Sequence, residues 1–192
     1  HKITIDKGMG QEADSGALAV NTGEFTGRSP QDRFIVRDAI TRDKVWWGPV
    51  NIPFEPAAFD KLYEKVVRYL SLKEVYVRDC FACADPEYRM PIRAVNEYPW
   101  SNLFVYNMFI RPEAAELQGF EPEWTVINAP GFKADPKVDG TRQHNFAILN
   151  FTRKIALIGG TGYTGEIKKG IFSALNFILP VFRNTLPMHC SA

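Results

Sequence analysis

The 192-residue sequence has few cysteines, almost no net charge and no long apolar run. Three cysteines are an odd number, which argues against a disulfide framework and favours reduced thiols in a cytoplasmic protein. Lys and Arg number 23 against 22 Asp and Glu, so the formal charge of +1 indicates neither a nucleic-acid partner nor a membrane partner. Charges interrupt the longest apolar stretches within about ten residues, whereas a membrane-spanning helix needs about 20. Recognition of any anion must therefore depend on local clusters.

What the chain does contain is enough apolar surface for a packed core. Hydrophobic residues make up 45% and aromatic residues 13% of the sequence, which favours a folded domain over disorder. The length allows one sizeable core. The chain begins at His1, without the apolar segment of a secretory signal, and stops at Ala192 directly after a Met-His-Cys-Ser run. We therefore expect a single domain, residues 1–192, cut from a longer protein.

Hydrophobic periodicity and turn residues predict both strands and helices. The predicted strands are 17–20, 33–37, 74–84, 90–95, 124–128, 145–150 and 154–158. The predicted helices are 54–71, 100–110 and 166–179, with Pro180 ending the last. The tight connection between the last two strands predicts a hairpin. Because strands and helices mix without strict alternation, the sequence predicts an α/β fold with a mixed β-sheet and flanking helices.

A glycine-rich turn presents an arginine in the segment Gly23-Glu-Phe-Thr-Gly27-Arg28-Ser29. A nucleotide-binding P-loop needs four residues between its glycines and then a lysine, whereas this turn has three residues and an arginine. We therefore reject a P-loop. An arginine on such a turn can bind a planar carboxylate or a phosphate with two hydrogen bonds. The alternative is a surface turn in which Arg28 pairs with Asp32.

A second glycine-rich segment, Gly160–Gly165, matches the dinucleotide-binding pattern G-x-G-x-x-G. That pattern also requires an acidic residue about 20 positions later, at the end of the next strand. Residues 183–187 contain no acid and leave no room for such a strand. A non-catalytic small-anion or dinucleotide-binding domain that uses this loop remains the alternative function.

Two adjacent lysines, Lys168 and Lys169, follow in the first turn of the predicted helix, where positive charge opposes the helix macrodipole. An anion or metal site would explain them, whereas the alternative is a solvated face on which Glu166 offsets their charge. Neighbours on a helix point about 100° apart, so only one lysine can face a given site.

The remaining candidate ligands are weaker. His189, taken alone, is more typical of a structural residue than of a ligand. Cys80 and Cys83 are three residues apart on a predicted strand, so their thiols face opposite sides. They should therefore neither share a metal nor form an unstrained disulfide.

Four segments carry signatures in a fixed order along the chain. They are Thr22–Val36 (T-G-x-x-T-G-R-S-P-x-D-x-F-I-V), Asn107–Pro112 (N-M-F-I-R-P), Leu157–Gly170 (L-I-G-G-T-x-Y-x-G-E-I-K-K-G) and Met188–Ala192 (M-H-C-S-A). Together they resemble the ATP-utilising phosphoenolpyruvate carboxykinases over nearly the whole chain. One departure is Gly162, where the family often has a tryptophan.

The resemblance implies a fold like the N-terminal domain of that family and the conversion of oxaloacetate and ATP to phosphoenolpyruvate, carbon dioxide and ADP in gluconeogenesis. It also implies roles for four residues. Arg28 would grip a substrate carboxylate, and Tyr163 would contact that carboxylate or the departing carbon dioxide. Lys169 would contact substrate and, with His189, bind Mn²⁺ (or Mg²⁺). An aspartate from another domain would complete the metal site.

The same resemblance places ATP mainly on a C-terminal domain that these residues do not include. Phosphoryl transfer needs a phosphate-binding loop, and none is present in the 192 residues. We therefore expect the isolated chain to be inactive and to bind ATP weakly or not at all.

Overall fold

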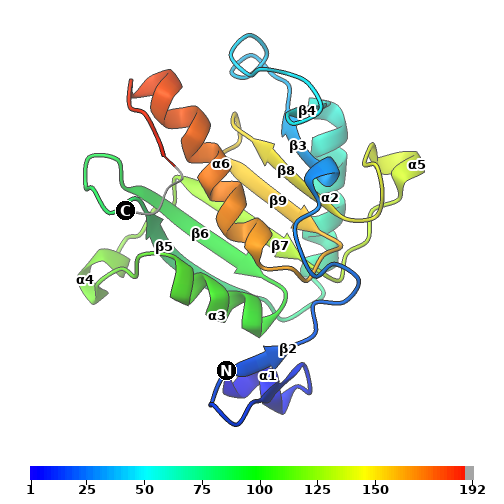
Figure 1. The fold of residues 1–192 in the computed structure, drawn as a ribbon, viewed down its shortest axis with the longest axis vertical. Helices are drawn as coiled ribbons and strands as arrows, with labels where there is room; N and C mark the ends of the chain where they lie inside the picture. Colours follow the sequence, from blue (N-terminus) through cyan, green and yellow to red (C-terminus); the bar gives the residue numbers. More distant parts are fainter. Residues whose placement is uncertain (189–192) are drawn as a thin grey trace.

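The predicted strands after residue 30 join one seven-stranded sheet in the computed structural model, which describes residues 1–188 (Figure 1). Its order is β4-β3-β8-β9-β7-β6-β5, with both parallel and antiparallel pairs, so the prediction of a mixed sheet is confirmed. The strands are β3 (Arg33–Val36), β4 (Ile52–Phe54), β5 (Tyr76–Ala82), β6 (Met90–Asn96), β7 (Trp124–Ala129), β8 (Phe146–Asn150) and β9 (Ile155–Gly159). The antiparallel pairing of β8 with β9 confirms the predicted hairpin.

Strand direction brings several loops to one edge of this sheet. Strands β6, β7 and β9 run parallel to one another, and β3, β4 and β8 run parallel in the opposite direction. The carboxyl end of β9 at Gly159 therefore lies at the same edge as the start of β3 at Arg33, with β8 between them. We call this edge, where β9 ends and β3 begins, the loop edge.

Helices cover both faces of the sheet. Helix α2 (Pro56–Leu70) covers one face, and α3 (Pro99–Met108) and α6 (Gly165–Phe182) cover the other (Figure 1). The helices bury side chains spaced three and four residues apart, such as Ile167, Ile171 and Ala174 of α6. Each face has its own hydrophobic core, and α6 contributes Ile167 and Ile171, near the loop edge, to one of them.

Two helix ends differ from the prediction. Helix α6 continues past Pro180 to Phe182, so the predicted end at residue 179 is wrong. A proline removes one backbone donor, but only two helical residues follow it here, and the N–H of Arg183 closes the last turn on Leu179. Helix α3 ends at Met108, before the predicted residue 110, because Ile110 pairs with β5 instead.

Several short elements were not predicted. They are α1 (Lys2–Asp6), β1 (Gly10–Glu12), which pairs with the predicted β2 (Leu18–Val20), a 3₁₀ turn at Pro30–Asp32, β4, α4 (Ala114–Leu117) and α5 (Pro136–Asp139). None is longer than five residues, too short to show a clear period. Phe54, predicted to begin the first long helix, ends β4 instead, and α2 begins at Pro56. Within residues 1–188, no helix is both long enough and apolar enough to span a bilayer.

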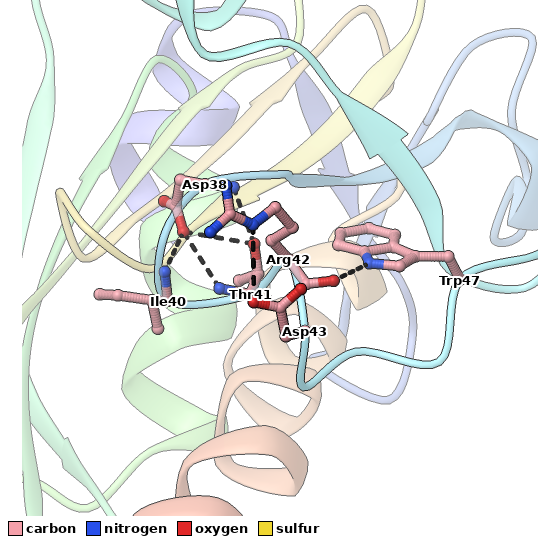
Figure 2. A network of polar contacts seen from close by, with 6 residues as sticks. All are labelled: Asp38, Ile40, Thr41, Arg42, Asp43 and Trp47. Atoms are coloured by element: carbon pink, nitrogen blue, oxygen red, sulfur yellow. Dashed lines mark hydrogen bonds and ion pairs between the residues drawn. The ribbon is translucent and has the colours of Figure 1, made fainter.

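The connection from β3 to β4, residues 37–51, holds its shape through its own hydrogen bonds (Figure 2). The Asp38 carboxylate accepts the backbone N–H groups of Ile40 and Thr41 at 2.9 and 3.2 Å. The Trp47 indole donates to the carbonyl of Arg42 at 2.9 Å. Parallel neighbours such as β3 and β4 cannot be joined by a tight hairpin, so the chain needs a longer crossover.

Candidate functional site

Two glycine-rich loops touch at the loop edge. The first, residues 22–29, precedes β3, and the second, residues 160–165, connects β9 to α6. A Cβ atom added at Gly162 would lie 2.6 Å from the carbonyl oxygen of Thr22. The backbones of the two loops are therefore in direct contact, and a side chain at position 162 would require one of them to shift from the position it has here.

Asp32 anchors the first loop to the segment before β8. Its carboxylate is 1% exposed and accepts two hydrogen bonds from Arg142, both at 2.8 Å, and one from Gln143 at 2.6 Å. The Ser29 hydroxyl also donates to it. The alternative in which Asp32 pairs with Arg28 is therefore wrong: a guanidinium from a distant segment fills that role, and Arg28 remains exposed to solvent.

Glu166, in the first turn of α6, joins the two loops. It is 3% exposed, accepts the backbone N–H of Ser29 at 3.4 Å and lies 3.6 Å from the Arg33 guanidinium. Arg33 in turn donates to the Ser173 hydroxyl at 2.7 Å. Burial raises the pKa of Glu166, while the charges of Arg33 and Arg28 oppose that rise.

The charges of Arg28 and Lys169 interact across this junction. Burial lowers the pKa of Lys169, and the positive charges of Arg28, Lys168 and Arg33 lower it further. Lys168 is exposed, whereas Lys169 is half-buried, with its ammonium 5.3 Å from the ring centre of Phe172. The lowered pKa makes the neutral amine easier to form, which is the form of lysine that can bind a metal.

Tyr163 lies in the second loop beside the same junction. Its ring covers Gly165 so closely that an added Cβ there would lie 2.4 Å from the ring. Its backbone N–H donates to the Thr161 hydroxyl at 3.2 Å. Of the four residues named from the sequence, the structure thus places Arg28, Tyr163 and Lys169 on two touching loops and the helix that follows them. His189 lies outside the described residues.

Residues 1–188 contain no group of three or more His, Cys, Asp and Glu side chains arranged to hold a metal. In that part of the chain, the predicted metal site is represented by Lys169 alone. The two cysteines of the described residues, Cys80 and Cys83, are free thiols.

The dinucleotide-binding alternative fits poorly with the second loop. An added Cβ at Gly160 would lie 2.4 Å from the carbonyl oxygen of His144, so this backbone is packed against protein rather than open to a pyrophosphate. The preceding strand β9 pairs parallel with β7 and antiparallel with β8, and no strand follows α6 within residues 1–188, whereas a Rossmann site opens a β-α-β unit of parallel strands.

The contacts that support the site could not be predicted from the sequence, although Asp32 and Glu166 themselves stand beside the motifs. Asp32 and Arg142 are 110 positions apart, and Ser29 and Glu166 are 137 apart, so no local pattern links them. One feature of the sequence points to Glu166. It stands directly after the second glycine loop in the first turn of a helix, where a negative charge interacts favourably with the helix macrodipole.

The fold and the site define an α/β domain that carries Arg28, Arg33 and Lys169 at one edge of a mixed sheet. Comparison with known proteins agrees. The family model for phosphoenolpyruvate carboxykinase matches residues 1–192. The chain belongs to the phosphoenolpyruvate carboxykinase family, as its motifs predict.

Its curated relatives are longer proteins. The "Phosphoenolpyruvate carboxykinase (ATP)" of Flavobacterium johnsoniae is 73% identical over 192 residues, which is 100% of this chain and 36% of the relative. The protein of the same name from Christiangramia forsetii is 71% identical over the same shares. "Phosphoenolpyruvate carboxykinase (ATP) 1" of Moorella thermoacetica is 54% identical over 191 residues, again 100% of this chain and 36% of the relative. The chain therefore spans about a third of the length of these relatives.

Proposed function

We propose that this chain supplies the oxaloacetate-binding side of an ATP-dependent phosphoenolpyruvate carboxykinase. The reaction converts oxaloacetate and ATP to phosphoenolpyruvate, carbon dioxide and ADP. The observation that carries the proposal is the contact of the two glycine loops at Thr22 and Gly162, and the effect of the Arg28 charge on the pKa of Lys169 supports it. The names of the relatives support the choice of ATP.

The chemistry explains these residue types. Loss of carbon dioxide from oxaloacetate leaves an enolate, and fixed positive groups stabilise the charge that develops on its oxygen. Arg28 binds a substrate carboxylate through its planar guanidinium. Tyr163 contacts the same carboxylate or the departing carbon dioxide, and Lys169 faces the enolate.

A divalent metal fits the donors on this side of the site. Lys169 and His189 would hold Mn²⁺ or Mg²⁺, and the lowered pKa of Lys169 favours the neutral amine that ligation requires. When bound, the ion supplies Lewis-acid stabilisation of the enolate oxygen.

We propose that residues outside these 192 bind ATP and carry out phosphoryl transfer. The sequence contains no G-x-x-x-x-G-K-[ST] motif that could cradle the phosphates of ATP. We therefore propose that this chain alone does not turn over oxaloacetate with MnATP. We further propose that the enzyme is cytoplasmic, with which the two free cysteines of the described part are compatible, and that it serves gluconeogenesis.

Calorimetry with oxalate, a mimic of the enolate of pyruvate, tests the proposal. We expect the chain to bind oxalate and Arg28→Ala to weaken binding at least about tenfold, because an ionic hydrogen bond contributes about 1.5–3 kcal/mol. The matched control is Arg153→Ala, which removes an exposed arginine from the opposite edge of the sheet, where it pairs with Asp60. Tight binding of NAD without binding of oxalate would instead favour a dinucleotide-binding domain.

A further inference from the structure

Glu166 is the side chain through which α6 holds the first glycine loop. It is nearly fully buried, accepts the Ser29 N–H at 3.4 Å and faces Arg33 at 3.6 Å. We propose that Glu166 is a positioning residue, which fixes the Arg28 backbone on α6 and so sets the direction of the Arg28 guanidinium. This inference rests on the proposed role of Arg28 in anion binding.

The contact with Ser29 is well placed for such a role. The N–H of Ser29 belongs to the peptide unit that begins at Arg28, and holding that unit restricts the backbone on which the arginine side chain is mounted. The first part of the loop has contacts of its own: Thr22 touches Gly162, Glu24 lies 3.3 Å from the His144 imidazole, and the Phe25 ring packs against the same histidine. Asp32 and Glu166 hold the end of the loop, and the Glu166 contact is the one made directly to the peptide unit after Arg28.

The two anchoring carboxylates differ in how well they are satisfied. Asp32 accepts hydrogen bonds from Ser29, Arg142 and Gln143. Glu166 accepts one long hydrogen bond, and its buried Oε2 atom accepts none from residues 1 to 188, where its nearest charged partner is the Arg33 guanidinium at 3.6 Å. An incompletely satisfied buried carboxylate destabilises a fold, so stability alone does not account for it. The positioning of the first loop accounts for this buried carboxylate.

Electrostatics alone would predict the opposite effect on binding. A carboxylate beside Arg28 repels an incoming anion and weakens its binding. If charge were the whole effect of Glu166, its neutralisation would strengthen oxalate binding, and a change that preserves the charge would have no effect. If geometry dominates, the outcome is reversed.

Two substitutions separate geometry from charge. Glu166→Asp keeps the charge but withdraws the carboxylate from Ser29 by about 1.5 Å, the length of one carbon–carbon bond. A cavity of about 150 Å³ beside Glu166, lined in part by Arg33 and Ser173, gives the shortened acid room to be hydrated. Glu166→Gln removes the charge but keeps an oxygen that can accept the Ser29 N–H. The matched controls are Glu123→Asp and Glu123→Gln, because Glu123 is an exposed glutamate paired with Lys154 at the opposite edge of the sheet.

Oxalate calorimetry on the 192-residue chain is the first readout. We expect Glu166→Asp to weaken binding about tenfold, as expected for a displaced binding group, while Glu166→Gln stays within about twofold of the unsubstituted chain. In the Arg28→Ala background, Glu166→Asp should have no further effect, because a positioning residue acts through the group it positions. Three results would overturn the inference. They are stronger oxalate binding in Glu166→Gln, an equal loss of oxalate affinity in Glu166→Asp and Glu166→Gln, and a loss caused by Glu166→Asp that is just as large in the Arg28→Ala background.

Hydrogen exchange of residues 23–29 without any ligand is the second readout. We expect faster exchange in Glu166→Asp than in Glu166→Gln or the Glu123 variants, with thermal melting confirming that each is folded. Identical exchange in all of them would overturn the inference.

If the unsubstituted chain binds no oxalate, the proposed function fails, and the exchange rates still decide whether Glu166 holds the loop. If oxalate binds through Arg28 and Glu166→Asp changes nothing, the inference alone fails. If Glu166→Asp does not fold, Glu166→Gln decides. A large change in its oxalate affinity or in its loop exchange would overturn the inference, and the absence of any such change would support it.

Discussion

The two glycine-rich loops look alike in sequence but differ in their surroundings. In the first loop, Gly23 and Gly27 face open space, with no atom of the described residues within 4 Å of an added Cβ. In the second, an added Cβ at any of the four glycines between residues 159 and 165 would lie only 2.4–2.6 Å from another atom. The first loop therefore uses glycine mainly for its turn, whereas the second uses it because nothing larger fits.

A buried carboxylate follows each loop, and the two carboxylates differ as well. Asp32 is fixed by short hydrogen bonds, whereas Glu166 is held by longer contacts at 3.4 and 3.6 Å. The second loop is thus closely packed, and together with α6 it supports the first loop, which carries Arg28. We call the second loop and α6 the frame, and the first loop the mounted loop. This division between frame and mounted loop can be tested by matched substitutions.

The largest effect is expected from Gly160→Ala compared with Gly23→Ala. Both glycines have positive φ, +69° and +78°, so alanine is strained at each. Only at Gly160 would the methyl group also meet backbone, 2.4 Å from the His144 carbonyl oxygen. We expect the free energy of unfolding to fall by about 4 kcal/mol for Gly160→Ala and by about 1 kcal/mol for Gly23→Ala. Urea denaturation measures both, and equal losses would contradict the difference between the loops.

A smaller effect is expected from Gly162→Ala, with Gly27→Ala as its control. A methyl group at position 162 would press on Thr22 and separate the loops, which should cost about 2 kcal/mol of stability and weaken oxalate binding about tenfold. Gly27→Ala enters open space, so its stability should change by no more than about 0.5 kcal/mol, with unchanged affinity. If Gly27→Ala weakens oxalate binding as much as Gly162→Ala, contact between the loops is not what forms the site.

The smallest effect concerns pH, where the two carboxylates should respond in opposite directions. Burial would raise the pKa of Asp32, but hydrogen bonds, chiefly from Arg142, hold it below its ordinary value of 3.8. Its stabilisation is present above pH 3.8 and is lost as the pH falls through the lowered pKa. Burial raises the pKa of Glu166 above its ordinary value of 4.5, so its contribution is present below pH 4.5 and is lost as the pH rises through the raised pKa.

Denaturation between about pH 3 and pH 7 checks this with two differences in unfolding free energy. The advantage of the unsubstituted chain over Asp32→Asn should shrink on acidification. Its stability relative to Glu166→Gln should fall as the pH rises. Differences that do not vary with pH would show that neither carboxylate has a shifted pKa.

Most of the fold could be predicted because its longer elements carry a local period. The apolar positions of α2 at Phe59, Leu62 and Val66 all prove fully buried. The β8–β9 hairpin follows from two apolar runs with a short connection. The short strands β1 and β4 were missed because three residues show no period, and their pairing partners alone stabilise them.

The site could be predicted only in part. Arg28, Tyr163 and Lys169 could be named as candidates because they lie within short motifs that can be recognised without a structure, and their roles stay predictions. Their arrangement on two touching loops and one helix could not be read from spacing. The alternative in which Asp32 pairs with Arg28 is wrong for that reason: Arg28 is its neighbour in sequence, whereas its partner in space is Arg142.

The sequence by itself determined the family, the main strands and helices, and the residue types available for the chemistry, since each of these depends on residues close together along the chain. Only the tertiary structure decided which loop supports which. The contacts of Gly162 with Thr22 and of Glu166 with Ser29 join segments more than 130 positions apart. Such contacts arise from strand order and helix packing, and no local period or turn preference encodes them.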